Sequence, residues 1–414
     1  MMRDTSVAVG VEIGGQRTTV ALVDAFGQVH HRLYARTLWG RPAMATLQPC
    51  LRAIDTALAQ ARAEGVRVRG IGVCVPGTLD RTLRRPLVIP TLPTLSGFPL
   101  CDLLEARYQL PIQLHVDVEA AVLGEYCFGA GQGFQRPLFL TVNAVVGAAM
   151  VVDGMVARSG QQYVGHVCHI PVATSGPRCS CGKRGCINTL VSLEALQKMV
   201  QRALRRGEET NLIQRLSNRE SFSPQLLAEE AARGDSVALW IYNEVGRWLG
   251  TAASKYISLF APDILILGGS VLPASELLLS QVRAALATQA PVQASNIVQL
   301  VPAQLGSDAS LVGAVTSLFS NDAAQDIMRS VQLADVAPDT DAQIEALRPP
   351  RRAGHTRRKP DHERARLVAE HAFAPYPYHD SATQTDADVE EPRDGLHSTW
   401  LTDQWLGGRP QDTI

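Results

Sequence analysis

The chain has 414 residues, which is long for one compact domain and sufficient for two domains and a tail. Hydrophobic residues make up 46% and charged residues 19%, which excludes a wholly disordered or collagen-like chain. With 39 Lys and Arg against 40 Asp and Glu, the formal net charge is -1, so no overall field draws the protein onto nucleic acid or lipid.

No uncharged apolar run reaches the length of about 18 residues that a transmembrane helix needs, so none is expected. The apolar stretch near the N-terminus contains Glu12 and lacks a cleavage-site pattern, so it predicts a first strand and not a signal peptide. Eight cysteines are too few for a disulfide framework, and three of them fall between Cys179 and Cys186. This clustering indicates a metal site in the reducing cytoplasm.

Residues 1–127 predict a strand-rich start followed by alternating helices and strands. Strands are expected at 7–13, 18–23, 29–34, 70–75 and 112–116, with a turn at 24–27, and helices at 44–63 and 118–127. Pro76 and Gly77 end the fourth strand. The order of these elements favours an α/β protein with largely buried sheets.

Residues 138–319 predict a second block of the same kind. Strands are expected at 138–142, 147–152, 264–267 and 297–301, and helices at 192–204, 224–232, 235–259, 274–288 and 309–319. Two opening groups of strands, each followed by helices, predict two similar halves. We place an N-terminal domain at 1–118 with 305–320 and a C-terminal domain at 119–304.

The tail, residues 321–414, differs in composition from the rest of the chain. Residues 348–366 contain eight basic and two acidic side chains, whereas 380–394 is acidic and polar. The apolar content is too low to offset the entropy of ordering, so the tail is predicted to be mostly disordered. The basic stretch 348–366 more often represents a solvated segment than a binding site for nucleic acid or another anionic partner.

Four residues form the strongest chemical pattern in the chain. His169, Cys179, Cys181 and Cys186 are spaced H-x9-C-x-C-x4-C, and three thiolates with one imidazole are a ligand set that zinc prefers. His166 and Cys168 are nearby rivals. A site with four protein ligands has no open position for water, so we predict a structural zinc and not a hydrolytic centre.

The segment around these residues resembles the signature of the ROK family of sugar kinases and sugar-responsive repressors. The resemblance covers residues 7 to about 319 and includes VGVEIGGQRTTVALVD, VCVPGTLD, VDVEAAVLGE, GHVCHIPVATSGPRCSCGKRGCINTLVS, ILILGGSV and LGSDASLVGAV. The resemblance implies the two-domain actin-like ATPase (ribonuclease H-like) fold, with sugar and nucleotide meeting in a cleft. It also implies transfer of the ATP γ-phosphoryl group to a sugar hydroxyl in those members that are kinases.

The resemblance implies Asp117 as the catalytic base and a sugar contact. The family motif is N-D-x-N, and here Val116 and Glu119 replace its two asparagines. Implied sugar contacts also include His166 and Asn188, where the family has glutamates, and His169, which is retained. From the residues alone, Asp117 is better explained as the N-terminal cap of the 118–127 helix.

The implied phosphate and nucleotide contacts are partly lost. In the first loop Gly14 and Gly15 are present, but Glu12 and Gln16 stand where the family has Asp and Thr. The second loop, G-T-G-x-G in the family, is replaced by 143–147 and keeps only its last glycine, Gly147. We expect that turn to have another shape and not to hold phosphate, because glycines permit positive φ and close approach of an anion to N–H groups. The pair Gly268–Gly269 on the adenosine side is retained.

Together these losses predict a non-catalytic or weakly active ROK protein that senses a sugar or acts as a scaffold. The first alternative is a sugar kinase of glucokinase or N-acetylhexosamine kinase type, and only that alternative requires Mg-ATP. The second is a transcriptional regulator acting through a partner or the basic tail. No N-terminal helix-turn-helix is expected, since the core begins near residue 7, and nucleic acid is a candidate partner for 348–366 but not for the core. A homodimer or tetramer is expected, with the helices between 192 and 260 at its two-fold interface.

Overall fold

The computed structural model describes residues 6–158, 167–217, 222–269, 276–289 and 298–319. The tail predicted at 321–414 and the candidate sugar contact His166 lie outside these residues. None of the helices in the described part of the chain combines the length and the apolar character that a bilayer crossing requires.

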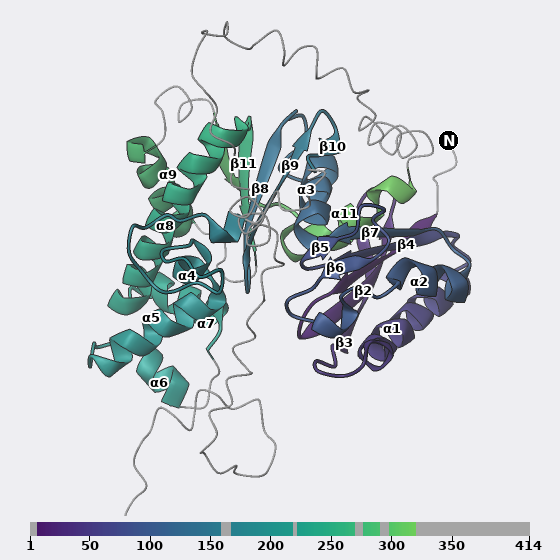
Figure 1. Cartoon of the computed structure of the whole chain (residues 1–414), viewed down its shortest axis with the longest axis horizontal. Coiled ribbons are helices and arrows are strands. Elements are labelled where there is room, and N and C mark those ends of the chain that lie inside the picture. The colour runs from purple at the N-terminus through teal and green to yellow at the C-terminus, as the bar shows by residue number, and fades with distance from the viewer. Residues whose placement is uncertain (1–5, 159–166, 218–221, 270–275, 290–297, 320–414) are drawn as a thin grey trace, which may run out of the picture. The chain divides into compact units, whose positions relative to one another are not determined.

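Two five-stranded mixed sheets organise the described chain (Figure 1). The first has the order β3-β2-β1-β4-β7 and the second the order β10-β9-β8-β11-β12. The strands of the first sheet are β1 (Val7–Ile13), β2 (Arg17–Asp24), β3 (Val29–Arg36), β4 (Val68–Val75) and β7 (Ile112–Val116). Those of the second are β8 (Pro137–Val142), β9 (Val146–Val152), β10 (Met155–Val156), β11 (Ile264–Gly268) and β12 (Gln299–Pro302).

Both sheets are built by the same rule. In each, three strands run antiparallel in sequence order, a fourth strand pairs in parallel with the first, and a fifth pairs in parallel with the fourth. The expectation of an α/β protein with two similar halves is therefore confirmed, whereas the exact domain boundaries remain a prediction.

The helices lie close to their predicted positions. They are α1 (Ala43–Ala63), α2 (Leu100–Tyr108), α3 (Asp117–Phe128), α4 (Asn188–Val191), α5 (Leu193–Arg205), α6 (Leu212–Ser217), α7 (Pro224–Ala232), α8 (Ser236–Phe260), α9 (Glu276–Gln289) and α11 (Ala309–Val315), with short 3-10 turns at Pro93–Leu95, Val167–His169, Gly306–Asp308 and Thr316–Leu318. The predicted helix at 309–319 is shorter than expected, because its last part becomes one of these turns. Helices α2, α4 and α6 and the small hairpin of β5 (Thr78–Leu79) and β6 (Pro86–Val88) were not predicted.

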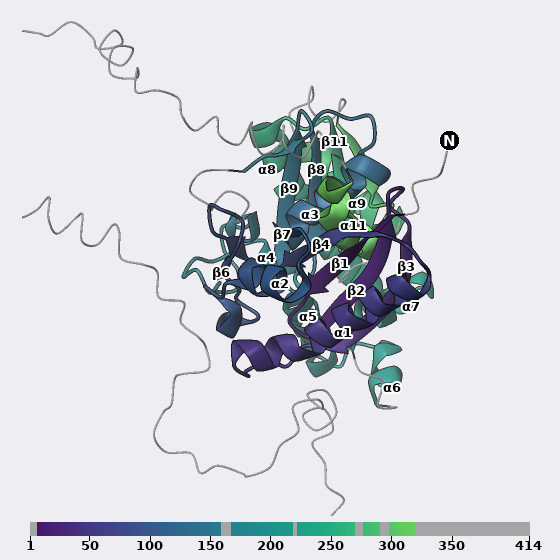
Figure 2. The same ribbon diagram turned by 90° about the vertical axis from the view of Figure 1, so that its right-hand side faces the viewer.

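Each sheet has its own apolar core. In the first, α1 packs against one face, where Ile54, Val9 and Leu22 are among the fully buried side chains (Figure 2). In the second, the long helix α8 packs beside α9 and supplies buried residues such as Tyr242 and Leu249. Burial of this kind contributes most of the favourable free energy of folding.

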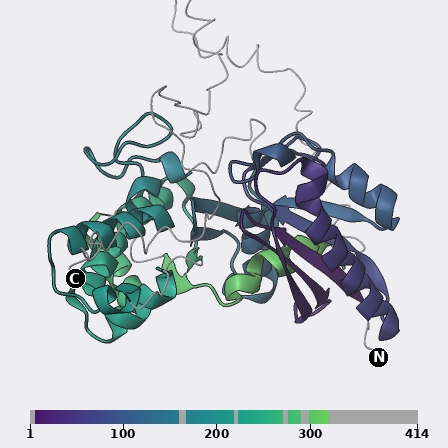
Figure 3. The ribbon, with the colours of Figure 1, turned by 90° about the horizontal axis from the view of Figure 1, so that it is seen from below.

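Helices α3 and α11 cross at close range although they are far apart in sequence. Figure 3 shows the light-green helix α11 beside the purple strands of the first sheet, and α11 contacts β1, β2 and β4. At the crossing, a Cβ atom on Gly313 would lie 1.6 Å from the carbonyl oxygen of Ala120. This contact requires glycine and fixes the start of α3 relative to the first sheet.

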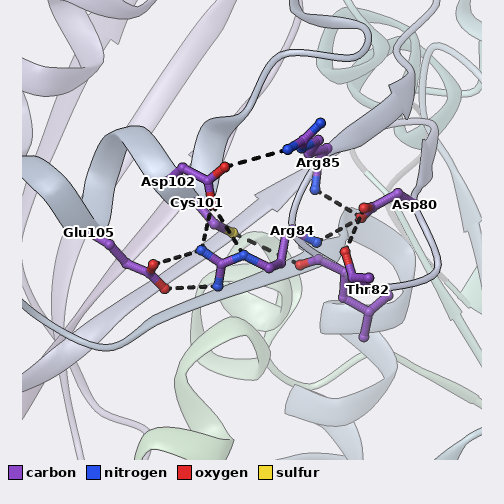
Figure 4. A network of polar contacts seen from close by, with 8 residues as sticks. Asp80, Thr82, Arg84, Arg85, Cys101, Asp102 and Glu105 are labelled. Atoms are coloured by element: carbon purple, nitrogen blue, oxygen red, sulfur yellow. Dashed lines mark hydrogen bonds and ion pairs between the residues drawn. The ribbon is translucent and has the colours of Figure 1, made fainter.

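A surface network ties the β5–β6 hairpin to α2 (Figure 4). Arg84 donates to Asp102 at 2.7 Å and to Glu105 at 2.6 Å, and Asp80 accepts from the backbone N–H groups of Arg84 and Arg85. Because these side chains are exposed to solvent, the ion pairs stabilise the fold only modestly.

Candidate functional site

The four predicted metal ligands come together in space. The 3-10 turn Val167–His169 supplies His169, and the loop before α4 supplies Cys179, Cys181 and Cys186. One ligand atom from each lies within 4.8 Å of all the others. The Sγ atom of Cys179 is 3.3 Å from Nδ1 of His169, and the Sγ atoms of Cys181 and Cys186 are 3.6 Å apart. We call these four residues the Cys/His cluster; it could hold a metal ion.

The backbone around the cluster is shaped for this arrangement. Isolated bridges pair Pro171 with Cys186 and Arg178 with Arg184. Gly185 has a φ of 70°, and a Cβ there would lie 2.1 Å from the carbonyl oxygen of Ala173, so only glycine fits. The rival ligand Cys168 is buried but lies outside the group of four. Three thiols and one imidazole suit a tetrahedral ion without an open position.

Asp117 is the first residue of α3, directly after β7. Its side chain is half-buried, and one carboxylate oxygen accepts from the N–H of Val118 at 2.7 Å. Burial raises the pKa of Asp117 to about 7, and the carboxylates of Glu12 and Glu119 add to the rise. A carboxyl group that titrates near neutral pH is suited to accept a proton from a hydroxyl.

Two residues beside Asp117 were missed in the sequence. Arg158 forms an ion pair with Glu119 at 2.7 Å, so the carboxylate in place of the family asparagine already has a partner. His115 is buried, and among the described residues neither of its ring nitrogens has a hydrogen-bond partner. Burial lowers the pKa of His115 to about 3, helped by the charge of Arg158, so its ring is neutral.

The first turn, between β1 and β2, borders a shallow hollow of about 330 Å³. Its lining residues are Glu12, Gly14, Gln16, Arg17 and Thr19. The N–H of Gly14 donates to the carbonyl of Arg17 at 3.0 Å and closes the turn. Burial raises the pKa of Glu12, although a hydrogen bond with Ser310 of α11 opposes the rise. Three of the predicted phosphate residues, Glu12, Gly14 and Gln16, therefore share one hollow, and Gly15 lies between them in the chain.

The second turn, at residues 143–145, connects β8 to β9 as a tight hairpin. None of the residues 143–147 has a positive φ. The N–H of Asn143 donates to the carbonyl of Val145 at 3.3 Å, and the N–H of Val146 donates to Oδ1 of Asn188 at 2.9 Å. Two backbone donors of this turn are therefore engaged within the protein. Through this bond Asn188, the predicted sugar contact, ties α4 to the hairpin.

The retained pair Gly268–Gly269 ends β11 next to β8. Gly269 has a φ of 117°, and a Cβ there would lie 2.3 Å from the carbonyl oxygen of Val142. A side chain at residue 269 would therefore clash with the backbone at the end of β8, so this position requires glycine. This structural requirement accounts for Gly269 whether or not a nucleotide binds nearby.

Comparisons with known proteins agree with the resemblance seen in the sequence. The sequence model of the ROK family matches residues 8–320. A glucokinase of Thermotoga maritima is 28% identical over 308 residues, which is 74% of this chain and 96% of that protein. A xylose repressor of Caldicellulosiruptor bescii is 23% identical over 319 residues, 77% of this chain and 79% of the repressor.

A solved structure with a similar fold is a ROK family glucokinase from Streptomyces griseus in complex with glucose and AMPPNP. It is 30% identical, covers 75% of this chain and 98% of its own, and superposes with a TM-score of 0.64. Chains of this fold thus include both enzymes and repressors.

Proposed function

Because the chain belongs to the ROK family, we propose that it is a non-catalytic or weakly active sugar-responsive protein, with a sensing or scaffold role in the cytoplasm. The observation that carries this proposal is the hairpin at residues 143–145. It has no positive φ, and the N–H groups of Asn143 and Val146 already have acceptors within the protein. A triphosphate needs several converging backbone N–H groups, and this turn would have to break internal bonds to provide them.

The sugar would lie against Asp117, His169 and Asn188, with His166 as a further contact. Asp117 is half-buried at the start of α3, where it can accept a hydrogen bond from a sugar hydroxyl. Asn188 retains amide donors for a second hydroxyl while its oxygen stays bonded to Val146. A neutral amide binds a hydroxyl more weakly than the carboxylate that the family pattern has at this position, which favours a sensor of moderate affinity.

The Cys/His cluster would hold zinc, with a purely structural role. Bound zinc would link the turn that carries His169 to the loop before α4, and so fix both His169 and Asn188. We expect about one zinc ion per chain in freshly purified, reduced protein. Metal analysis that finds none would contradict this assignment.

The central test combines melting curves with a coupled kinase assay on the full chain. A panel of hexoses and N-acetylhexosamines is expected to include a sugar that raises the melting temperature, whereas Mg-ATP alone leaves it unchanged. Asp117→Asn should weaken the response to the sugar. Clear ATP-dependent turnover that disappears in Asp117→Asn would refute the proposal.

The first alternative is an ATP-dependent kinase of glucokinase or N-acetylhexosamine kinase type. The observation in its favour is Asp117, whose pKa of about 7 is suited to a general base. In that case Mg-ATP would be required, and Glu12, Gly14, Gly15, Gln16, Gly147, Gly268 and Gly269 would contact it. The same coupled assay separates this alternative from a sensor.

The second alternative is a regulator of transcription, favoured by the repressors among the relatives. DNA contact would come from a partner protein or from the basic stretch 348–366. Binding of duplex DNA that falls steeply with salt and disappears on removal of residues after 320 would support it. We also propose a homodimer or tetramer, which light scattering tests directly.

A further inference from the structure

Three cations and two exposed aromatic rings lie at the start of β2, at the end of β3 and in the connection that follows β3. Arg17 begins β2 and Arg36 ends β3, and the two are direct partners in the antiparallel register. The guanidinium of Arg17 lies 4.6 Å from the centre of the Tyr34 ring. Trp39 and Arg41 follow in the connection to α1. We call these five residues the Arg17–Trp39 surface.

The aromatic rings of this surface are unusually exposed. Tyr34 is 58% and Trp39 69% exposed, and the neighbouring Leu38 and Met44 are exposed as well. Single exposed apolar side chains are common, but four of them within eleven residues of chain are a high local concentration. Concentrated exposed apolar side chains often mark places where another molecule binds.

The arginines of the surface lack a close acidic partner among the described residues, although the charge of Arg17 opposes the rise in the pKa of Glu12. Within the described residues, Arg17, Arg36 and Arg41 form no ion pair, whereas Arg32 on the same strand is paired with Asp308. Like charges directly opposite each other on antiparallel strands repel and destabilise the pairing. An anion between Arg17 and Arg36 would remove this repulsion and accept charge-assisted hydrogen bonds from both.

The surface is also held in place before any ligand binds. Thr37 donates from its N–H to the carbonyl of Gln16 at 3.1 Å and from its hydroxyl to that of Gly14 at 2.8 Å. The hydroxyl of Thr46 lies 3.0 Å from the carbonyl oxygens of both Leu38 and Arg41. These bonds fix the connection that carries Trp39, so a ligand would meet little entropic cost of ordering.

We propose that the Arg17–Trp39 surface binds single-stranded nucleic acid, with phosphates at Arg17 and Arg36 and bases stacked on Tyr34 and Trp39. Proteins that bind single strands combine unpaired cations with aromatic rings on which bases stack. An acidic peptide would satisfy the arginines but offers no planar rings, and a duplex hides the faces of its bases. The surface shares Arg17 with the hollow beside Glu12 and Gly14, but it includes none of the proposed sugar contacts, and this activity goes beyond the proposed function.

The test is fluorescence anisotropy of a short labelled thymidine oligonucleotide with the full-length protein at increasing salt. Each lost phosphate contact lowers the salt slope of a single-strand complex by about 0.7, so the double variant Arg17→Gln, Arg36→Gln should lower it by about 1.4. Trp39→Ala should weaken binding by about 5- to 150-fold through lost stacking. The matched control removes two exposed arginines from α1, as Arg52→Gln with Arg62→Gln, and should leave binding nearly unchanged.

Melting curves serve as the folding control: the Arg17, Arg36 double variant removes a repulsive pair and also the contact of Arg17 with Tyr34, so its melting temperature should stay within about 4 °C of the wild type. The proposal is overturned if no oligonucleotide binds at low salt, or if the double variant binds as the wild type does. It is also overturned if a polyglutamate peptide or a duplex competes as well as the single strand. Binding that disappears only when Arg351, Arg352, Arg357 and Arg358 are changed to Gln would assign the activity to the tail instead.

Discussion

The crossing of α3 and α11 makes one substitution, Gly313→Ala, a sharp test of the fold. A Cβ on residue 313 would lie 1.6 Å from the oxygen and 2.5 Å from the carbon of the Ala120 carbonyl, and 2.7 Å from the nitrogen of Gly124. All three are backbone atoms, so no side chain can rotate away, and the helices must separate by about 1.5 Å to restore a normal contact. Overpacking typically costs about 1–3 kcal/mol and occasionally more, and we expect about 3 kcal/mol here.

At about 2–4 °C per kcal/mol, this loss corresponds to a melting temperature lower by about 6–12 °C. Urea unfolding and calorimetry of the full chain measure it. Gly147→Ala is the matched control, because a Cβ on residue 147 would meet the methyl group of Thr141 at 3.2 Å and the backbone φ is not positive. The reasoning is refuted if Gly313→Ala melts within about 2 °C of the wild type, or if Gly147→Ala loses as much stability.

Four further predictions concern buried polar groups. Glu125→Ala should cost about 3–5 kcal/mol in urea unfolding, because the buried carboxylate accepts from the N–H groups of Ala130, Gln304 and Leu305, and losses below about 1 kcal/mol would contradict this. Asp117 has a folded pKa of about 7 against the ordinary carboxyl pKa of 3.8, so the folded state binds more protons between these pH values and loses stability as the pH rises through them. Asp117→Asn should therefore melt above the wild type at pH 8 and lose this advantage towards pH 4; an advantage independent of pH would argue against the shift. His115 has a folded pKa of about 3 against an ordinary value of 6.5, so the unfolded state binds more protons between these values and the protein loses stability as the pH falls below 6.5. His115→Leu should therefore flatten the acid side of the plot of melting temperature against pH. An unchanged plot would exclude a buried neutral ring. A chelator should lower the melting temperature and make Cys179 and Cys186 reactive towards a thiol reagent; unchanged reactivity would mean that no metal protects them.

The repeating elements of the fold could be predicted because their signals are local. Helix α8 was expected at 235–259 and spans Ser236–Phe260, and the side chain of Asp235 accepts from the N–H of Ala238 at its start. Helix α2 was missed because it has nine residues, follows Pro99 and has no side-chain cap. Its position is set by the burial of Leu100 and Leu104 in the first core, which is a tertiary effect.

The same distinction between local signals and tertiary effects applies to the residues of the candidate site. The Cys/His cluster was visible because its ligands follow a spacing that metal coordination demands, and Asp117 was visible through a family motif. The pair of Glu119 and Arg158 joins residues 39 apart in the chain, and no sequence period connects them. The bond between Asn188 and Val146 depends on how α4 meets β9, which only the packed structure specifies.

Glycines in this chain can be required by backbone packing or by the binding of a phosphate group. Gly185, Gly269 and Gly313 remain where a Cβ would lie within about 2.3 Å of a backbone oxygen, so the fold itself requires them. The turn at 143–145 has no glycine, and its backbone needs none, because no residue there has a positive φ. The family resemblance implies glycines in this turn, and the observed backbone of the turn does not require them. The N–H groups of Asn143 and Val146 already have acceptors within the protein, so the hairpin offers few donors to a triphosphate, and this is the physical argument that supports our proposal of a sensor over a kinase.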